Sequence, residues 1–298
     1  MSEATRRYYD DNAQLILDLM GRQFNSALVS GADDLATCLA DDFDYIARTA
    51  DLRDGQAVLE GGSGNGLFCR RLRERFPALR YAGVELSEGQ IALARGHNPG
   101  TEFRAGSFDQ ADWPPASFDR ALFLESIGYS TDIDGLLQRL RHAVRPGGRV
   151  FIKNPGQKVS DWSDFLRHAS AFDPVRREYG FDDRSLGIVP DIDFIVRKFR
   201  GHGFRLVRED HPFYNEYFYN AAFYAPGVAR PVRRPEKTSI ALDAAGFDPE
   251  TSLSELGRRH PCYVRYHLQS ATGTGYLPSN RLTGCVILVF ELPAPARR

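Results

Sequence analysis

The sequence predicts an α/β fold in which a mostly parallel sheet carries helices on both faces. Two observations predict it: residues 55–152 alternate between strand-like and helical patterns five times, and the strand-like runs read as buried strands. The carboxyl ends of parallel strands meet at one edge of such a sheet, and a ligand is expected just outside them. The predicted strand ends are Glu60, Glu85, Ser107, Glu125 and Asn154.

The first of these strands is followed by the most informative segment of the chain. Residues 58–66 (VLEGGSGNG) indicate a buried strand that ends in Glu60, then a turn, then the start of a helix. Gly62, Gly64 and Gly66 stand at alternate positions, and glycine lets a backbone turn sharply and approach a ligand with no Cβ in the way. A glycine-rich turn alone is weak evidence of function, because many nucleotide-binding folds use one.

The segments that follow strengthen the signal. The strand-like run 81–84 ends in Glu85, which is placed to accept hydrogen bonds from the hydroxyls of a ribose. Residues 106–109 (GSFD) follow the third strand, and the run 118–124 ends at Glu125. Residues 144–152 (VRPGGRVFI) indicate a helix stop, a tight turn and a fifth buried strand.

In these motifs the chain resembles the class I S-adenosylmethionine-dependent methyltransferases, over roughly residues 40–155. The first motif of that family is matched by residues 60–66, its ribose-binding acid by Glu85, and its later landmarks by residues 117–119 and 145–148. The resemblance implies a Rossmann-like sheet of seven strands and S-adenosylmethionine as the cofactor. It implies these cofactor-binding residues: Glu60, Gly62, Ser63, Gly64, Gly66, Glu85, Leu86, Ser107, Phe108 and Leu124. Members of the family often carry Asp at the place of Ser107, so here Ser107 or Asp109 would contact the adenine amino group.

A dinucleotide-binding domain, with Glu85 on the ribose of a nicotinamide cofactor, is the alternative. Its fingerprint is Gly-x-Gly-x-x-Gly, and the last spacing of that fingerprint is longer than the one found here. The chain also lacks an obvious set of residues for the nicotinamide side.

Three regions are expected around this sheet. Residues 1–54 show apolar residues at helical spacing, and in the family this region forms a lid, from which Tyr8 and Tyr9 could reach the site. Residues 55–207 and 284–298 are expected to form the core, with a helix over 191–199 and strands over 203–207 and 284–290, the last strand antiparallel. The intervening residues 208–283 are too aromatic for disorder, and we interpret them as a substrate cap, together with residues 155–190.

Composition narrows the function further. The chain has 298 residues and a net charge of −1, with no evident basic stripe, so a nucleic-acid partner is not expected. No stretch approaches the ~20 apolar residues of a membrane span, and the first residues lack a secretion signal, so a cytoplasmic location is expected. The four cysteines are scattered and predict neither a zinc site nor a disulfide framework. The sequence is compatible with a homodimer but does not predict one.

The acceptor of the methyl group is predicted to be an alkene carbon. Glu125 ends the fourth strand, where a carboxylate can stabilise a cation and remove a proton. The cap contains the aromatic run 213–220, and aromatic faces also stabilise cations. The Glu125-Ser126 strand end, Tyr129 and the long aromatic insertion resemble the sterol, tocopherol and prenyl-diphosphate C-methyltransferases.

That narrower resemblance implies a short prenyl diphosphate as the small-molecule acceptor, with Mg²⁺ carried by the diphosphate and no metal site in the chain itself. Glu125 would be the general base, and the catalytic residues would be Glu125, Tyr129 and Tyr217. Arg suits bidentate phosphate contacts. The predicted substrate-binding residues are Tyr8, Lys153, Tyr214, Phe218, Tyr219, Phe223, Arg233 and Arg234.

Two other functions remain open at this point. A small-molecule O-methyltransferase would need a base for a phenol, hydroxyl or carboxyl acceptor, and His211 is the best placed of His168, His202, His211 and His260. A cofactor-binding regulatory or scaffold protein that has lost its chemistry is the third possibility, although the glycines, Glu85 and Glu125 are all present.

Overall fold

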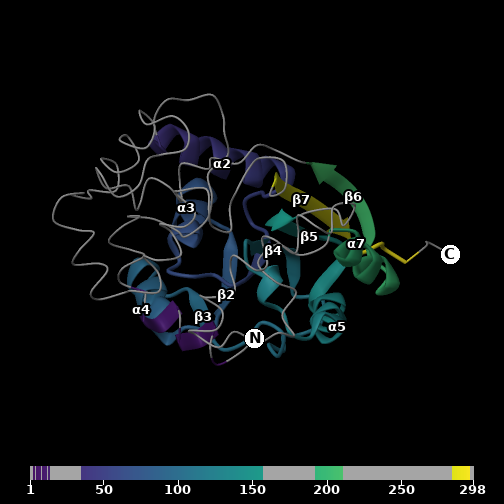
Figure 1. Ribbon diagram of the computed structural model, residues 1–298. Coiled ribbons are helices and arrows are strands. Elements are labelled where there is room, and N and C mark those ends of the chain that lie inside the picture. The colour runs from purple at the N-terminus through teal and green to yellow at the C-terminus, as the bar shows by residue number, and fades with distance from the viewer. Residues whose placement is uncertain are drawn as a thin grey trace, which may run out of the picture.

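A seven-stranded sheet forms the centre of the molecule (Figure 1), with strand order β3-β2-β1-β4-β5-β7-β6. The computed structural model describes residues 35–156, 192–210 and 284–295, together with residues 3, 5–7, 9–11 and 13 near the N-terminus. The elements in chain order are α2 (Leu35–Thr49), β1 (Ala57–Gly61), α3 (Leu67–Arg75), β2 (Arg80–Glu85), α4 (Glu88–His97), β3 (Glu102–Ala105), β4 (Phe118–Leu124), the short 3-10 helix η1 (Ile127–Tyr129), α5 (Ile133–Ala143), β5 (Val144–Gly156), α7 (Ile192–Gly201), β6 (Arg205–Asp210) and β7 (Gly284–Glu291).

Strand β1 lies at the point where the strand order reverses. It pairs in parallel with β2 on one side and with β4 on the other, and β3 and β5 extend the parallel sheet outward. Chain connections leave such a point in opposite directions, which opens a crevice at the carboxyl ends of the strands. The fold therefore places the residues that follow β1, β2 and β4 around one crevice.

Alternating side chains of the strands pack against two helical layers. Val58, Leu122 and Phe151 pack with α2, α3 and α4 in one apolar cluster. Leu59, Phe123 and Ile152 pack with α5 and α7 in the other. Because successive residues of a strand point to opposite faces, strands that are apolar throughout require cover on both faces.

The predicted fold class is confirmed: the sheet has seven strands, and β7 runs antiparallel to both β5 and β6. The alternation of strands with helices fails at one place, because residues 106–117 between β3 and β4 form no helix. Pro114 and Pro115 cannot donate helical hydrogen bonds. Phe108 and Trp113 of this segment are instead buried in the core, with Trp113 packed edge-on against Phe118.

Strand β5 is longer than expected. It begins at Val144, which pairs with Phe118, and the regular ladder resumes only at Arg149, opposite Arg120. The predicted tight turn is therefore an irregularity inside the strand, where Gly147 has φ 79° and donates its N–H to Leu292 over 2.7 Å.

Residues 1–54, predicted as a lid, include helix α2, which packs against the sheet. Helix α2 buries Phe43, Ile46 and Ala47 against the sheet. At the other predicted boundary, β6 pairs with β7 as far as Asp210, opposite Ile287, so residues 208–210 are part of the sheet rather than of the cap. Residues 211–283 and 157–191, which hold the rest of the predicted cap, lie outside the described residues. None of the described helices is long and apolar enough to cross a bilayer.

Candidate functional site

The glycine turn after β1 is held tightly from both sides. The N–H groups of Gly62 and Ser63 donate to the carbonyl of Val84, over 2.8 and 3.1 Å. Gly62 has φ 76°, and a Cβ on it would stand 2.5 Å from the Cβ of Ser126. Neither condition admits a side chain at that position. The turn is therefore a fixed piece of backbone wedged between the ends of β2 and β4.

Gly64 differs from Gly62, because a Cβ on it would meet nothing within 4 Å. Its φ of 53° lies in the left-handed region, so glycine is favoured here by conformation. The space in front of Gly64 opens into the pocket described below. A ligand can thus approach the main chain of this turn directly.

Glu85, at the end of β2, is tied to the glycine turn. One carboxylate oxygen accepts a hydrogen bond from the Gly64 N–H over 3.0 Å, and the other accepts one from the Ser87 N–H over 2.9 Å. Burial raises the pKa of Glu85, and the backbone N–H groups of Ser87, Gly64 and Leu86 partly offset that rise. Each carboxylate oxygen keeps accepting capacity for a ligand hydroxyl.

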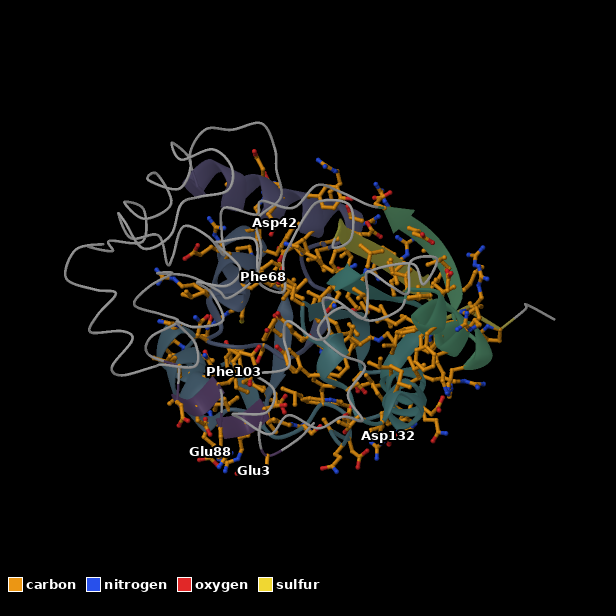
Figure 2. The ribbon with its side chains drawn as sticks, in the orientation of Figure 1. Glu3, Asp42, Phe68, Glu88, Phe103 and Asp132 are labelled. Atoms are coloured by element: carbon orange, nitrogen blue, oxygen red, sulfur yellow. The ribbon has the colours of Figure 1, made fainter. Side chains whose placement is uncertain are left out.

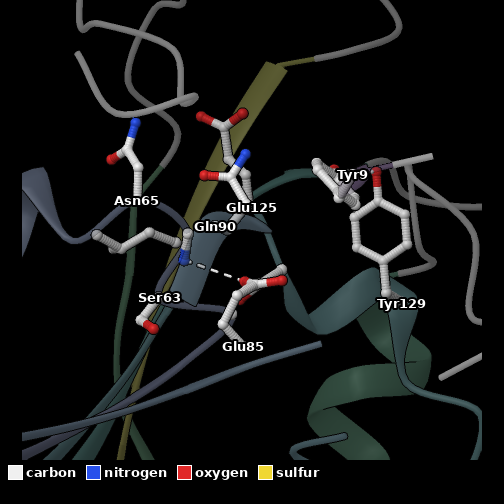
Figure 3. A pocket seen from close by; sticks show the side chains of 11 residues that line it. Tyr9, Ser63, Asn65, Glu85, Gln90, Glu125 and Tyr129 are labelled. Carbon is white, nitrogen blue, oxygen red and sulfur yellow. Dashed lines mark hydrogen bonds between the residues drawn. The ribbon is translucent and has the colours of Figure 1, made fainter. Parts of the chain in front are cut away.

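A pocket lies at the carboxyl ends of β1, β2 and β4 (Figure 3). In the picture, Glu85 points upward from β2, while Tyr9 and Tyr129 stand together at the opposite side from Asn65. The pocket is lined by Tyr9, Gly62, Ser63, Gly64, Asn65, Glu85, Gln90, Leu124, Glu125, Ser126 and Tyr129. This is the crevice that the strand order creates.

Glu125 enters this pocket from a strained backbone. Its φ is 57°, which is rare for a residue with a long side chain and stores a modest strain energy. Its N–H donates to the carbonyl of Lys153 on β5 over 2.6 Å, which holds the turn in place. Such outliers gather at functional sites, because the surrounding structure must enforce them.

Tyr129 closes the pocket beside Glu125. The hydroxyl of Tyr9 donates to the hydroxyl of Tyr129 over 2.8 Å, and the rings meet edge-on. Burial, followed by the negative charges of Glu125 and Glu85, raises the pKa of Tyr129 to about 12, although the hydrogen bond from Tyr9 works in the opposite direction. Tyr129 is therefore a neutral phenol at any physiological pH.

Two buried polar atoms in the pocket have no hydrogen-bond partner among the described residues. They are the hydroxyl oxygen of Ser63 and the side-chain amide oxygen of Gln90. Ser63 is 4% exposed and Gln90 3% exposed, and a buried polar group without a partner costs about 1–3 kcal/mol. Both atoms belong to residues that line the pocket, but the Ser63 oxygen faces Gly83, on which a Cβ would lie 2.7 Å from it.

Some predicted cofactor residues lie beside the pocket rather than in it. Glu60 is buried, its carboxylate accepts a hydrogen bond from the Tyr81 hydroxyl, and burial raises its pKa to about 8. Gly66 begins α3 against Asn98, and the side-chain amide of Asn98 donates to the Gly66 carbonyl. Phe108 packs edge-on against Phe123 inside the core. Leu86 and Ser107 also lie outside the residues that line the pocket.

Asp109, the alternative adenine contact, is not among the residues that line this pocket. It is buried, and its carboxylate accepts hydrogen bonds from the Ser130 hydroxyl over 2.7 Å and from the Thr131 N–H over 2.9 Å. Its role in the fold is to tie the loop after β3 to the loop after η1.

Lys153 is placed differently from its prediction as a substrate ligand. Its side chain is 1% exposed, and its ammonium group contacts both carboxylate oxygens of Asp42 on α2, at 2.9 and 2.7 Å. A paired and buried ammonium group is not available to a diphosphate, so we do not propose Lys153 as a substrate ligand. It instead anchors α2 to the strand whose carbonyl holds Glu125.

The remaining predicted substrate and catalytic residues fall outside the described residues. They are Tyr8, Tyr214, Tyr217, Phe218, Tyr219, Phe223, Arg233 and Arg234, and the same holds for His168, His211 and His260. His202 is described, and its imidazole contacts Asp134 on α5, 3.0 Å away, on the opposite side of the sheet from α4.

Four pocket residues were not among those predicted to form the site: Tyr9, Asn65, Gln90 and Ser126. For Tyr9 the sequence predicts only that it could reach the site from the lid. Gln90 follows Ser87 by three positions, a spacing that indicates a helix start, and the Ser87 hydroxyl does accept the Gln90 N–H. Because α4 begins at the strand-end rim, a residue of its first turn can line the pocket, as Gln90 does, and that is the signal that could have identified it.

Comparisons with known proteins find similarity to methyltransferases. Residues 58–148 match the family model described as a methyltransferase domain. A malonyl-[acyl-carrier protein] O-methyltransferase of Serratia marcescens is 27% identical over 166 residues. The match covers 50% of this chain and 64% of that protein, so the chain spans less than two thirds of this relative.

Solved structures share the fold over nearly the whole chain. The [4+2]-cyclase SpnF superposes with a TM-score of 0.71 at 16% identity, covering 98% of this chain and 96% of the other. The geranyl diphosphate C-methyltransferase of Streptomyces coelicolor A3(2), in complex with Mg²⁺, geranyl diphosphate and S-adenosyl-L-homocysteine, superposes with a TM-score of 0.60 at 9% identity, covering 98% of both chains. At such identities the likeness shows the fold alone. Within the described residues, no three His, Cys, Asp or Glu side chains gather to form a metal site.

Proposed function

We propose, from the methyltransferase domain that residues 58–148 carry, that this protein is an S-adenosylmethionine-dependent methyltransferase. Its favoured reaction is C-methylation of the alkene of a short prenyl diphosphate, a small hydrophobic natural-product precursor. The observation that carries the proposal is that three features line one pocket. They are the glycine turn at Gly64, which has open space in front of it, the buried carboxylate of Glu85, and the carboxylate of Glu125, whose backbone has a positive φ.

The described residues fit the cofactor. Gly64 leaves room for a ligand against the main chain, and Glu85 has lone pairs for ribose hydroxyls. Gln90, whose side-chain oxygen has no hydrogen-bond partner, is a further polar residue that lines the same pocket. When bound, S-adenosylmethionine supplies an activated methyl group. The pocket then has to hold the acceptor in line with that group.

Glu125 is proposed to do the chemistry on the acceptor. Addition of a methyl group to an alkene leaves a carbocation on the acceptor, and a nearby carboxylate stabilises that charge. The carboxylate of Glu125 then removes a proton from the carbon next to the cationic centre, which restores a double bond. Tyr129, a neutral phenol, lines the same pocket and adds an aromatic face.

The lid and the cap complete the proposal. The residues before α2 and residues 211–283 are proposed to cover the acceptor, with Tyr8, Tyr214, Phe218, Tyr219 and Phe223 lining its hydrocarbon part and Tyr217 near the cation. Arg233 and Arg234 are proposed to bind the diphosphate, together with Mg²⁺ carried by the substrate. A guanidinium pair can contact phosphate oxygens in bidentate fashion.

O-methylation is the second candidate, and the name of the Serratia marcescens relative favours it. A phenol or hydroxyl acceptor would need a base, and the described residues that line the pocket include no histidine or lysine. His211 is then the residue to examine.

Transfer of labelled methyl from S-adenosylmethionine to two acceptor panels tests the proposal. One panel holds dimethylallyl, geranyl and farnesyl diphosphate, each with and without Mg²⁺, and the other holds phenols and carboxylic acids. Label in a diphosphate product supports C-methylation. Label only in the oxygen acceptors supports O-methylation, and tight cofactor binding with no label in any product would overturn both in favour of a protein that has lost its chemistry.

A further inference from the structure

Asp10 connects the N-terminal helical segment (the described residues 5–7, 9–11 and 13) to the first turn of α4. One oxygen of its carboxylate accepts hydrogen bonds from the Ser87 hydroxyl over 2.6 Å and from the Gly89 N–H over 3.1 Å. The other oxygen accepts from Arg6 over 3.0 Å. The first N–H groups of a helix have no partner within the helix, so Asp10 caps α4 from a distant part of the chain.

The two segments also pack closely at this point. A Cβ on Gly89 would lie only 3.1 Å from the Cβ of Ala13, and Ala13 is buried. In Figure 1 the N-terminal segment, in purple, runs beside α4, and in Figure 2 Glu3 and Glu88 lie at the same corner of the molecule. Two small residues, Ala13 and Gly89, therefore let the N-terminal segment approach α4.

The contact of Asp10 with Ser87 is linked by further hydrogen bonds to Glu85 and Gly64, which line the pocket. Ser87, which donates its hydroxyl to Asp10, donates its N–H to Glu85, and Glu85 in turn accepts the Gly64 N–H. Asp10 also raises the pKa of Glu85 through its negative charge, after the larger effect of burial. Asp10 is therefore linked by hydrogen bonds to the carboxylate of Glu85 through one intervening residue, Ser87.

Tyr9, next to Asp10, meets the other side of the pocket. Its hydroxyl bonds to Tyr129 at the end of η1, and both tyrosines line the pocket. The N-terminal segment is thus held at two points, by Asp10 on the β2–α4 side and by Tyr9 on the β4–η1 side.

We propose that Asp10 is a positioning residue for cofactor binding, which docks the N-terminal segment on α4 and so holds Tyr9 against Tyr129 at the side of the pocket. The inference rests on the proposed function for the identity of the cofactor, but the docking itself does not. When Asp10 is lost, the docked position of the N-terminal segment is populated for only part of the time, and the apparent dissociation constant rises in proportion.

The test compares Asp10→Ala and Asp10→Asn with Asp11→Ala in the full chain. Asp11 is the exposed neighbour of Asp10 and carries the same charge, so its variant is a matched control. Docking is measured without ligand, as amide exchange at Gly89, with the Gln90 amide as the internal control because it bonds to Ser87. Affinity is measured by calorimetry with S-adenosylmethionine.

Asp10→Ala is expected to speed exchange at Gly89 about tenfold or more while leaving Gln90 less affected. It is also expected to raise the dissociation constant of S-adenosylmethionine about tenfold. Asp10→Asn, which keeps an acceptor oxygen, should restore part of both effects, and Asp11→Ala should change neither.

Unchanged exchange at Gly89 in Asp10→Ala would overturn the docking. Faster exchange at Gly89 together with unchanged affinity would overturn the positioning role. If the wild-type protein does not bind S-adenosylmethionine, the proposed function fails, whereas the Gly89 measurement still decides the docking.

Discussion

The backbone N–H of Glu125 donates a hydrogen bond to the carbonyl oxygen of Lys153 over 2.6 Å. This bond joins the turn after β4 to a strand whose Lys153 side chain is itself fixed to Asp42 on α2. The turn keeps Glu125 at φ 57°. The carboxylate of Glu125 therefore extends into the pocket from a left-handed backbone, which the hydrogen bond to Lys153 holds in place. Strain of this kind persists only where its surroundings enforce it.

Relief of this strain gives the first prediction. Glu125→Gly should raise the free energy of unfolding by about 1 kcal/mol, because glycine adopts a positive φ without strain. The same variant should lose methyl transfer, since the carboxylate is gone. Urea denaturation monitored by circular dichroism measures the first effect. A stability equal to or below that of the wild type would show that the backbone of Glu125 is not strained.

The glycine turn gives a second prediction, with a control inside the chain. Gly64 and Gly100 both have positive φ, 53° and 78°, and a Cβ would meet no atom within 4 Å at either position. Each alanine variant should lose about 1–2 kcal/mol of stability from backbone strain. Only Gly64→Ala places a methyl group in the pocket, so only it should weaken S-adenosylmethionine binding, measured by calorimetry. Equal affinities in the two variants would contradict a close approach of the cofactor to Gly64.

Glu85 gives a third prediction. Both of its oxygens accept backbone N–H groups, from Gly64 and Ser87, and in Glu85→Gln one of these donors would face the amide NH₂. The variant should therefore lose stability and should bind S-adenosylmethionine at least about tenfold more weakly, because hydrogen bonds to a charged group contribute about 1.5–3 kcal/mol. Glu88→Gln, at an exposed neighbouring position, is the control. Wild-type affinity in Glu85→Gln would remove Glu85 from the cofactor site.

Glu60 gives a prediction on pH. Its pKa in the folded protein is raised to about 8 by burial, while an unfolded chain has a Glu pKa of about 4.3. Between these values the folded state holds the proton more tightly than the unfolded state. The stability that Glu60 contributes is therefore present at low pH and falls as pH rises through this window, by up to about 1.4 kcal/mol per pH unit.

Glu60→Gln should remove that slope. The unfolding free energies of the wild type and the variant should diverge between about pH 5 and pH 8, with the wild type becoming relatively less stable as pH rises. Denaturation curves at several pH values measure the difference. Parallel pH profiles would mean that Glu60 titrates normally in the folded protein.

Local patterns were sufficient to predict the sheet and the centre of the site. Buried strands that end in Glu60, Glu85 and Glu125, with a glycine turn between the first two, specify a crevice by topology alone. The strands and the pocket positions of Gly62, Ser63, Gly64, Glu85, Leu124, Glu125 and Tyr129 follow from it. Such signals are strong because strand burial and glycine conformation are properties of short segments.

The predictions that failed or were missed depend on contacts between distant segments. Lys153 lies in β5, yet its orientation toward α2 and its pairing with Asp42 could not be read from local sequence. Asp109 is likewise bound by Ser130 and Thr131 of another loop. Tyr9 enters the pocket because Asp10 docks its segment on α4. Each case is decided by a partner more than 20 residues away.

The most direct test of the proposed function is the separation of binding from turnover in Glu125→Gln. Labelled methyl transfer from S-adenosylmethionine to geranyl diphosphate, with Mg²⁺, is measured beside the dissociation constant of S-adenosylmethionine, in the wild type, Glu125→Gln and the exposed control Glu88→Gln. The proposal predicts that Glu125→Gln binds the cofactor as the wild type does and transfers no label, while Glu88→Gln does both. Wild-type turnover in Glu125→Gln would contradict the assignment of Glu125 as the base.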